Sequence, residues 1–194
     1  MSQHIKFVNT GQTDFFHILR ERVDQYFTSN GISPHANPAM VFKTIFMLAL
    51  YFVPFALIIS STATGLFFWI SWIIMGFGLA GIGMSVMHDA NHKAYSTNNS
   101  INTLVGYSLN LVGGDAANWK LQHNILHHTF TNIFGYDQDI ETKAVLRLSD
   151  HAPLKKFHKY QYVYAFLFYG LMTLSKLVTD FGQLIAFNKS GITR

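Results

Sequence analysis

Cysteine is absent from this chain of 194 residues, and charged residues are scarce. Without cysteine the chain can form no disulfide bond, and any metal site must use imidazole, carboxylate, amide or water ligands. Charged residues make up 12% of the sequence, which is half of the roughly 25% found in a typical soluble domain. Apolar residues account for 49%. This composition favours a membrane protein.

The scarcity of charge is greatest between Thr44 and Met87, where no Asp, Glu, Lys or Arg occurs. That stretch is long enough for two membrane-spanning helices of about 20 residues each. The polar run 60–65 predicts the turn between them, so we expect transmembrane helices over 41–59 and 66–87. The second helix contains small residues spaced four apart, which permit the close approach of another helix or of an acyl chain. These pairs are Gly76/Ala80 and Gly81/Ser85.

Basic residues flank the predicted hairpin on both sides. Because two spans return the chain to its starting side, both basic groups lie on one membrane face, and the positive-inside rule makes that face cytoplasmic. The net charge of +4 is modest and follows no single helical stripe, so we expect no nucleic-acid partner. The flanking basic residues are Lys6, Arg20, Arg22 and Lys43 before the hairpin, and, after it and before the third apolar segment, Lys93, Lys120, Lys143, Arg147, Lys155, Lys156 and Lys159.

The segments outside the hairpin predict further helices and complete an all-α fold. Residues 13–30 have an amphipathic pattern, which fits a helix on the membrane surface or one packed on the cytosolic part of the protein. Residues 88–160 are expected to be cytosolic. Within them, 101–113 is too short and polar to span and is expected to lie at the interface, and Asp115 is expected to cap the next helix. Residues 160–187 form a third apolar segment, for which a tilted span, a re-entrant element and an interfacial helix all remain open.

Half of the ten histidines fall in two clusters after the charge-free stretch. His88 and His92 are four residues apart, so on a helix they share one face. His123 and His127 repeat this spacing, and His128 lies on the neighbouring flank. Neutral imidazole is the commonest metal ligand in proteins. One such pair arises by chance on a helix surface, whereas two clusters on one predicted membrane face favour a metal site over ordinary surface residues.

The donor set indicates which metal and which chemistry to expect. Five histidines exceed the four ligands of an ordinary zinc site, which suggests two metal ions. A nitrogen-rich site without thiolate favours iron over copper or zinc. At a membrane boundary such a site suits lipid oxidation, because an unactivated C–H bond of an acyl chain cannot be deprotonated but can be broken by an oxidant formed from iron and O2.

The motifs HDANH (88–92) and WKLQHNILHH (119–128), with TFTN after the second, closely resemble the histidine boxes of the integral-membrane fatty acid desaturases. The resemblance, nearest to bacterial acyl-CoA desaturases of the linoleoyl-CoA type, covers essentially the whole chain from Phe15. It implies a non-haem di-iron centre, with O2 as co-substrate. It also implies removal of two hydrogens from adjacent acyl methylenes, which leaves a double bond and two waters.

The resemblance also implies partners and a location. The substrate would be a fatty acyl-CoA or a lipid-linked acyl chain, and the protein would be a multi-pass protein of a bacterial inner membrane with cytoplasmic histidine boxes. The chain contains no His-Pro-Gly-Gly haem-binding signature of a fused cytochrome b5. We therefore expect a separate electron donor, of the ferredoxin or cytochrome b5 type.

Carried over residue by residue, the resemblance makes the five histidines iron ligands and implies no catalytic residue beyond them. The ligands are His88 and His92 of the first box and His123, His127 and His128 of the second. Three polar residues inside the boxes are candidates either to orient the imidazoles through hydrogen bonds or to act as ordinary surface or capping groups. They are Asp89, Asn91 and Asn124. Trp119 is a candidate to line the acyl channel or to anchor its helix at the membrane interface.

The chain departs from the family pattern in one respect. Desaturases carry a third box, His/Gln-xx-His-His, after two further spans, whereas no histidine follows His158 here. His151 and His158 do not form that motif and are expected to lie on the surface. We therefore expect residues 1–194 to be the N-terminal part of a desaturase domain. A cytoplasmic third box would then favour a re-entrant or non-spanning element over 160–187.

Three alternatives remain. The first is an inactive truncated fragment, because metal ligands contribute cooperatively to affinity and a site without its third box would bind metal weakly. A membrane di-iron lipid hydroxylase would use the same ligands but rebind oxygen instead of removing a second hydrogen. A histidine-rich metal transporter or sensor would place ionisable groups inside its spans, and residues 44–87 contain no Asp, Glu, Lys or Arg. The TFTN and DQDI sequences near the second box favour the desaturase by resemblance.

Overall fold

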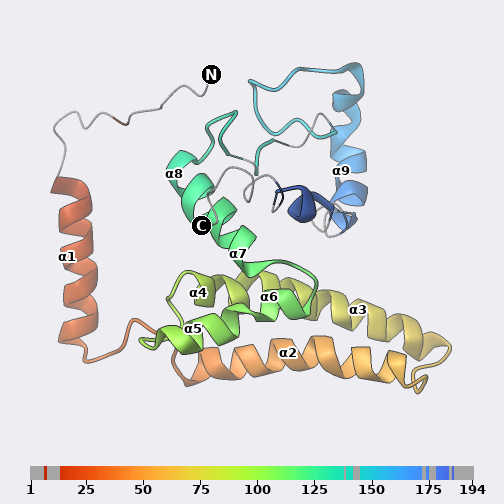
Figure 1. The fold of residues 1–194 in the computed structure, drawn as a ribbon, viewed down its shortest axis with the longest axis horizontal. Helices are drawn as coiled ribbons and strands as arrows, with labels where there is room; N and C mark the ends of the chain where they lie inside the picture. Colours follow the sequence, from red (N-terminus) through yellow and green to blue (C-terminus); the bar gives the residue numbers. More distant parts are fainter. Residues whose placement is uncertain are drawn as a thin grey trace.

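The computed structural model of the protein describes residues 7, 14–137, 139–141, 145–171, 174, 178–183 and 185. These residues form helices joined by turns and loops, and no strand occurs among them, so the predicted all-α fold is confirmed. One long helical hairpin forms a layer, and shorter helices lie over one of its sides (Figure 1).

The hairpin begins with α2 (Pro38–Ile59) and returns through α3 (Leu66–Gly81). The side chain of Asn37 accepts a hydrogen bond from the Met40 N–H at 2.9 Å and so caps α2. Pro38 occupies the first helical position, where a missing N–H does no harm. The turn between the two helices falls at residues 60–65, as predicted, with Gly65 at a φ of 55°.

The second helix of the hairpin is longer than predicted. α3 continues through a π-helical turn, η1 (Ile82–Val86), into α4 (Met87–Asn91), so the helix ends at Asn91 instead of near Met87. No glycine or proline occurs in residues 84–92, so the helix can continue beyond the end of the apolar stretch. Among the described residues, Pro38–Ile59 and Leu66–Asn91 are the helices long and apolar enough to cross a membrane.

The two helices of the hairpin approach most closely at Gly78. A Cβ atom added to Gly78 would lie 2.6 Å from the backbone nitrogen of Tyr51, and one added to Gly81 would collide with the Met47 side chain. A Cβ atom on Gly76 would meet open space. Of the predicted small residues, Gly81 therefore packs on α2 and Gly76 does not, while the closest contact is made by Gly78, which the spacing did not indicate.

Two short helices, α5 (Asn99–Gly106) and α6 (Ser108–Leu111), occupy the segment predicted to be interfacial and lie beside α4 and η1. The side chain of Asn98 caps α5 by accepting a hydrogen bond from the Ser100 N–H at 2.8 Å. Gly106 allows close packing here, because an added Cβ atom would collide with Oδ1 of Asn91. The first histidine cluster is thus braced from one side by α5.

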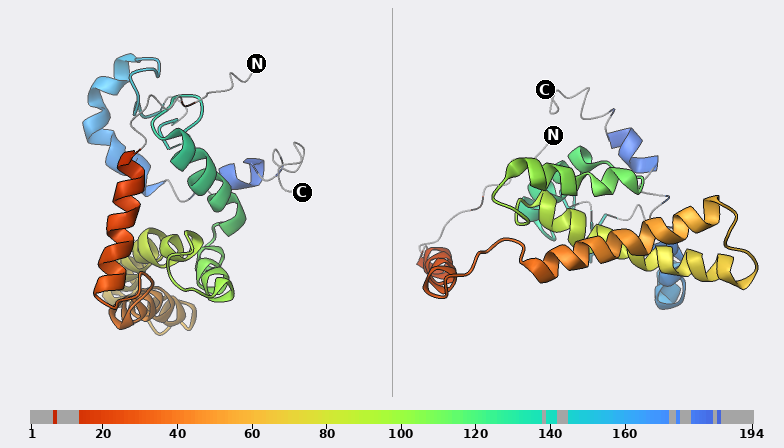
Figure 2. Two further views of the ribbon diagram at one scale, coloured as in Figure 1. Left: turned by 90° about the vertical axis from the view of Figure 1, so that its left-hand side faces the viewer. Right: turned by 90° about the horizontal axis from the view of Figure 1, so that it is seen from below.

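A second long helix carries the other histidine cluster. It consists of α7 (Ala116–Trp119), the π-helical segment η2 (Lys120–His127) and α8 (His128–Phe130), and it rises away from the hairpin (Figures 1 and 2). Oδ1 of Asp115 accepts a hydrogen bond from the Asn118 N–H at 2.6 Å. The predicted cap at Asp115 is therefore confirmed, and it sets where this helix begins.

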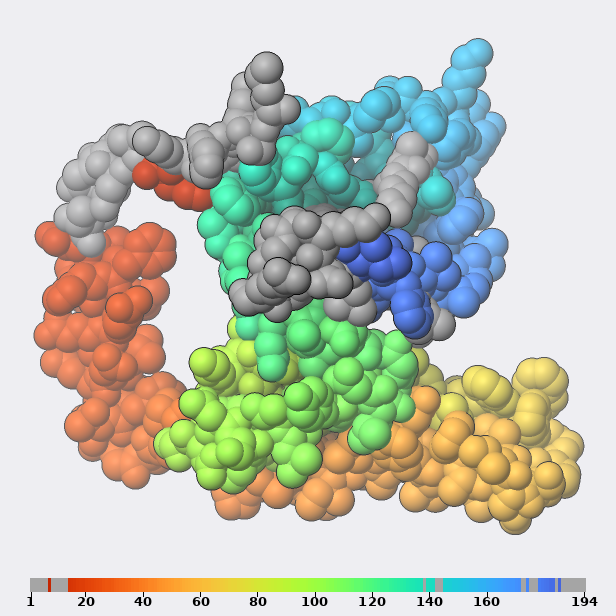
Figure 3. All heavy atoms as spheres, viewed as in Figure 1, coloured from red at the N-terminus to blue at the C-terminus, as the bar shows by residue number. Residues whose placement is uncertain are grey.

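The remaining described helices lie around this core. α1 (Asp14–Ser29) has the bounds of the predicted amphipathic helix and contains no buried residue. Figure 3 shows it standing clear of the α7–α8 side of the molecule. α9 (Gln161–Gly170) follows a 3-10 turn, η3 (Lys156–Tyr160). Its ten residues are fewer than the about 20 that a membrane span needs.

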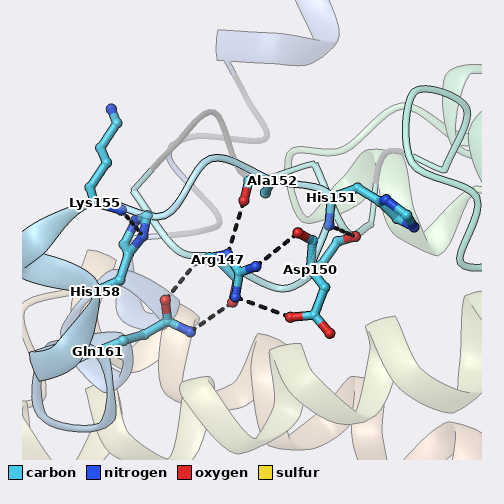
Figure 4. A network of polar contacts seen from close by, with 8 residues as sticks. Arg147, Asp150, His151, Ala152, Lys155, His158 and Gln161 are labelled. Atoms are coloured by element: carbon cyan, nitrogen blue, oxygen red, sulfur yellow. Dashed lines mark hydrogen bonds and ion pairs between the residues drawn. The ribbon is translucent and has the colours of Figure 1, made fainter.

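Arg147 organises the loop that precedes η3 (Figure 4). Its guanidinium group donates hydrogen bonds to the carbonyl groups of Ala152 and Asp150 at 2.9 and 2.8 Å, and its backbone N–H donates to Oε1 of Gln161 at 2.6 Å. His158 is buried in this region, with Nδ1 accepting from the Lys155 N–H at 3.1 Å. The expectation that His158 lies on the surface is therefore wrong, because the loop folds over it. His151 is exposed, as expected.

The hairpin contact yields a test with a matched pair of variants. We expect Gly78→Ala to destabilise the protein by roughly 1–3 kcal/mol, because the added methyl group overlaps the α2 backbone. Gly76→Ala should leave stability unchanged or raise it by up to about 1 kcal/mol, because alanine is the better helix former and meets open space. Thermal unfolding in detergent measures both. Equal midpoints for the two variants would contradict the close approach at Gly78.

Candidate metal centre

The structure brings the two histidine clusters together at the junction of the hairpin and the second long helix. The imidazole centroids of His88 and His92 lie 4.6 Å apart, and each lies 5.2 Å from that of His123. The His92 ring is also 5.0 Å from that of His128. Side chains separated by more than thirty positions in the sequence therefore share one small volume.

The π-helical winding of η2 determines which histidines face the first cluster. In a π-helix each N–H bonds to the carbonyl group five residues earlier, so a turn holds more residues than an α-helical turn. As a result His127 and His128 both lie beside His123. Their ring centroids are 5.2 and 4.8 Å from that of His123. The sequence spacing predicted that His127 shares a helix face with His123 and that His128 lies only on the neighbouring flank.

Two adjoining groups of side chains could each hold a metal ion. Ligand atoms of His88, His92 and His123 lie within 4.8 Å of one another, and so do ligand atoms of His123, His127 and Asp139. His123 belongs to both groups and is the centre of the cluster. The second group includes a carboxylate that the sequence analysis had not singled out.

The environment of His123 suits a metal ligand. Its Nε2 atom is buried and has no hydrogen-bond partner among the described residues. Burial, together with the neighbouring His128, His88, His92 and His127 rings, lowers the pKa of His123 to about 4. The imidazole is therefore neutral at neutral pH, and a neutral ring has one nitrogen with a free lone pair. A bound cation would satisfy it.

His92 is also held in the neutral form. Burial, then His88 and His128, lower the pKa of His92, while the Asp89 carboxylate opposes them. Asp89 lies at the edge of the cluster, 3.4 Å from Nδ1 of His88 and 3.8 Å from Nζ of Lys43. This geometry is compatible with the first of the two roles considered for Asp89, that of orienting the His88 ring.

Trp119 covers one side of the cluster. Its ring stacks on His123 with a centroid distance of 4.4 Å and an interplanar angle of 23°. It also meets the edges of His88 and His92, at 5.7 Å from each. The indole therefore excludes water from this side of the histidines.

Asn91 and Asn124 connect the two histidine-bearing helices to each other. Nδ2 of Asn124 donates a hydrogen bond to the backbone carbonyl group of Asn91 at 3.1 Å. The Asn91 side chain is buried, and its Nδ2 lies 3.6 Å from Sδ of Met87. The first of these contacts joins the two helices, the second lies within α4, and neither involves an imidazole.

Asp137 lies beside the second histidine cluster and was not among the predicted site residues. It is fully buried, and Oδ1 lies 3.0 Å from Nδ1 of His127. Burial alone would raise the pKa of Asp137, but hydrogen bonds from the Asn132 N–H, the His127 ring and the Asp139 N–H outweigh it and lower the pKa. The only signal in the sequence was its position within DQDI, ten residues after His127, which no helical spacing connects to the cluster.

Comparisons with known proteins identify the family of this chain. Residues 63–192 match the family model described as fatty acid desaturase. The chain is 36% identical over 181 residues to an acyl-lipid (8-3)-desaturase of Physcomitrium patens, and the aligned region covers 91% of this chain and 37% of that protein. It is 33% identical to a sn-1 linoleoyl-lipid 6-desaturase of Synechocystis sp., covering 82% of this chain and 45% of that protein.

A sn-1 linoleoyl-lipid 6-desaturase of Arthrospira platensis is 32% identical, over 84% of this chain and 44% of that protein. The chain thus spans less than half the length of these curated relatives. No solved structure matches it. The family match covers both histidine clusters and most of the chain, and the protein belongs to the fatty acid desaturase family.

Proposed function

We propose that the five clustered histidines bind iron as part of a di-iron fatty acyl desaturase. The observation that carries this proposal is the convergence of four imidazoles around His123, whose buried Nε2 has no partner among the described residues. The family match and the absence of cysteine support iron on nitrogen ligands. Bound iron would supply the oxidising power with which O2 removes hydrogen from an acyl chain.

The overall reaction would convert two adjacent methylene groups, O2, two electrons and two protons into a double bond and two waters. The residues of this chain would bind the metal and shape its surroundings. The five histidines would hold the metal, Trp119 would keep water from one side of it, and the Asp89–Lys43 pair would hold His88. A separate ferredoxin or cytochrome b5 type donor would supply the electrons.

The relatives favour one class of substrate. Those from Physcomitrium patens, Synechocystis sp. and Arthrospira platensis are named as acyl-lipid or linoleoyl-lipid desaturases. We therefore propose a lipid-linked acyl chain, in preference to an acyl-CoA, as the substrate. Membrane lipid would deliver such a chain directly to a site at the end of the hairpin.

We further propose that α2 and the helix 66–91 cross the membrane with the histidines on the cytoplasmic face. Large apolar side chains such as Phe67, Trp69 and Phe77 are exposed along the hairpin, which suits contact with lipid. α1 runs across the direction of the hairpin (Figures 1 and 2), as a helix in the membrane plane would. It buries no residue in the protein, which favours the membrane surface over packing on the cytosolic part.

Lipid analysis tests the proposed reaction. The whole protein, expressed in a host without endogenous desaturase, should produce a new unsaturated fatty acid that gas chromatography with mass spectrometry detects. The His127→Ala variant should produce none, because the site loses a ligand. Products that are hydroxy acids would replace this proposal with a hydroxylase, and an absence of any new product would contradict both.

Metal content tests the ligand set directly. We expect His123→Ala to weaken iron binding by more than the roughly 10–100-fold that loss of an outer hydrogen-bond partner costs, because His123 lies at the centre of the cluster. The exposed His151 provides the matched control, and His151→Ala should bind iron as the unaltered protein does. Iron per chain is measured by plasma mass spectrometry after dialysis against a weak chelator. Full iron content in His123→Ala would remove this residue from the ligand set.

The lowered pKa of His123 predicts how the stability of the metal-free protein depends on pH. The unfolded chain takes up a proton at His123 near pH 6.5, whereas the folded protein does so only near pH 4. Between these values the unfolded state binds more protons, so the free energy of unfolding falls as the pH falls from 6.5 to 4. Denaturation across this pH range should show that the free energy of unfolding declines less steeply for His123→Gln than for the unaltered protein. For His151→Gln the decline should be the same as in the unaltered protein. An identical slope in His123→Gln would show that His123 is not buried in its neutral form.

A further inference from the structure

Asp137 is a fully buried carboxylate beside the second histidine cluster. A buried carboxylate is costly unless hydrogen bonds compensate for the lost water. Oδ1 of Asp137 lies 3.0 Å from Nδ1 of His127 and accepts a hydrogen bond from the Asp139 N–H at 3.0 Å. Oδ2 accepts from the Asn132 N–H at 2.7 Å. Both oxygens are therefore occupied within the protein.

The contact with His127 determines which ring nitrogen carries the proton. An ionised carboxylate has only acceptor atoms, so the nitrogen that faces it must be a donor. Nδ1 of His127 therefore bears the hydrogen and donates it to Oδ1 of Asp137. The other nitrogen, Nε2, keeps a lone pair, which is the form that a metal ion requires.

The loop after α8 holds Asp137 firmly behind the ring. Asn132 and Gly135 both adopt positive φ values, of 63° and 90°, and turn the chain back toward η2. The Asp137 N–H donates to the Ile133 carbonyl group at 2.9 Å. The ring of His127 is stacked on that of His123 at an interplanar angle of 18°. One side of His127 thus rests on the cluster, and its Nδ1 is fixed by a carboxylate from another segment.

The other carboxylates near the described histidine rings are placed less favourably. Asp139 lies 3.3 Å from the same Nδ1 of His127, but its side chain is 50% exposed. Asp89 lies 3.4 Å from Nδ1 of His88, is 28% exposed and also faces Lys43. Asp137, with a side-chain exposure of 0%, is shielded from water and makes the shorter contact.

We propose that Asp137 is a positioning residue for the metal centre, which holds His127 in the Nδ1–H form so that Nε2 binds the metal. Asp137 itself does not bind the metal. This inference rests on the proposed function, because it takes His127 to be a ligand. It competes with one alternative, in which Asp139 is the carboxylate that matters and binds a metal together with His123 and His127.

A double-mutant cycle with Co²⁺ alone tests the proposal. The full chain in detergent is titrated with Co²⁺ as the unaltered protein, as Asp137→Asn, as His127→Ala and as the double variant. Asp137→Asn should bind Co²⁺ about 10–100-fold more weakly than the unaltered protein, which is the usual effect of losing such a hydrogen-bond partner. In the His127→Ala background the same change should cost nothing further, because there is no ring left to hold.

Control variants come from the same loop. Glu141→Gln neutralises an exposed carboxylate in that loop and should leave Co²⁺ affinity unchanged. Asp139→Asn should have a smaller effect than Asp137→Asn. An equal or larger effect of Asp139→Asn would overturn the proposal in favour of the alternative. A cost of Asp137→Asn that persists in the His127→Ala background would also overturn it, by showing that Asp137 acts through the folding of its loop.

The tautomer of His127 provides a readout that a purely structural role would not change. In the metal-free protein labelled with ¹⁵N-histidine, Nδ1 of His127 should carry the proton. Asp137→Asn should shift the ring toward a mixture of the two neutral forms. An unaltered protein that binds no Co²⁺ would refute the proposed function. Normal binding and an unchanged tautomer in Asp137→Asn would refute only the role of Asp137.

Discussion

The rest of the site depends on keeping the central imidazole ring, His123, uncharged. Burial and the four neighbouring rings lower the pKa of His123, because protonated rings this close would repel one another and burial removes the water that would screen the charge. The protein meets the constraint by placing His123 at the centre under Trp119 and by keeping the carboxylates Asp89 and Asp137 at the edges. The resulting concentration of unprotonated nitrogen atoms suits a cation.

The architecture around the cluster serves to hold two separate helices in register. The first cluster lies at the end of a helix whose apolar length fits a membrane, and the second lies on a helix that rises from it. A hydrogen bond from the Asn124 side chain to the Asn91 carbonyl group links them directly. Asn118, at the base of the second helix, donates to Oδ1 of Asp180 at 2.8 Å, so the segment 178–183 supports that helix from another side. Contacts far apart in the sequence therefore set the geometry of the histidines.

The sequence predicted those features that depend on local chemistry. The charge-free stretch marked the hairpin, the polar run 60–65 marked its turn, and Asp115 marked the start of a helix, because each signal acts on neighbouring residues. The spacing of the histidines correctly indicated shared helix faces. Features that depend on distant contacts were missed. Gly78 meets α2 only because of how two helices rotate against each other, and Asp137 reaches His127 only because a loop folds back.

The π-helical segment η2 has a consequence for the kind of change that the protein tolerates there. A π-helical turn holds more residues than an α-helical turn, so a return to ordinary winding with the same number of residues would rotate α8 relative to α7. Because each α-helical residue advances by about 100°, loss of one residue would offset that rotation, whereas gain of one would add to it. We therefore expect the segment to accept a one-residue deletion outside the histidines more readily than an insertion. The winding of this segment, as much as the identity of its residues, assembles the site.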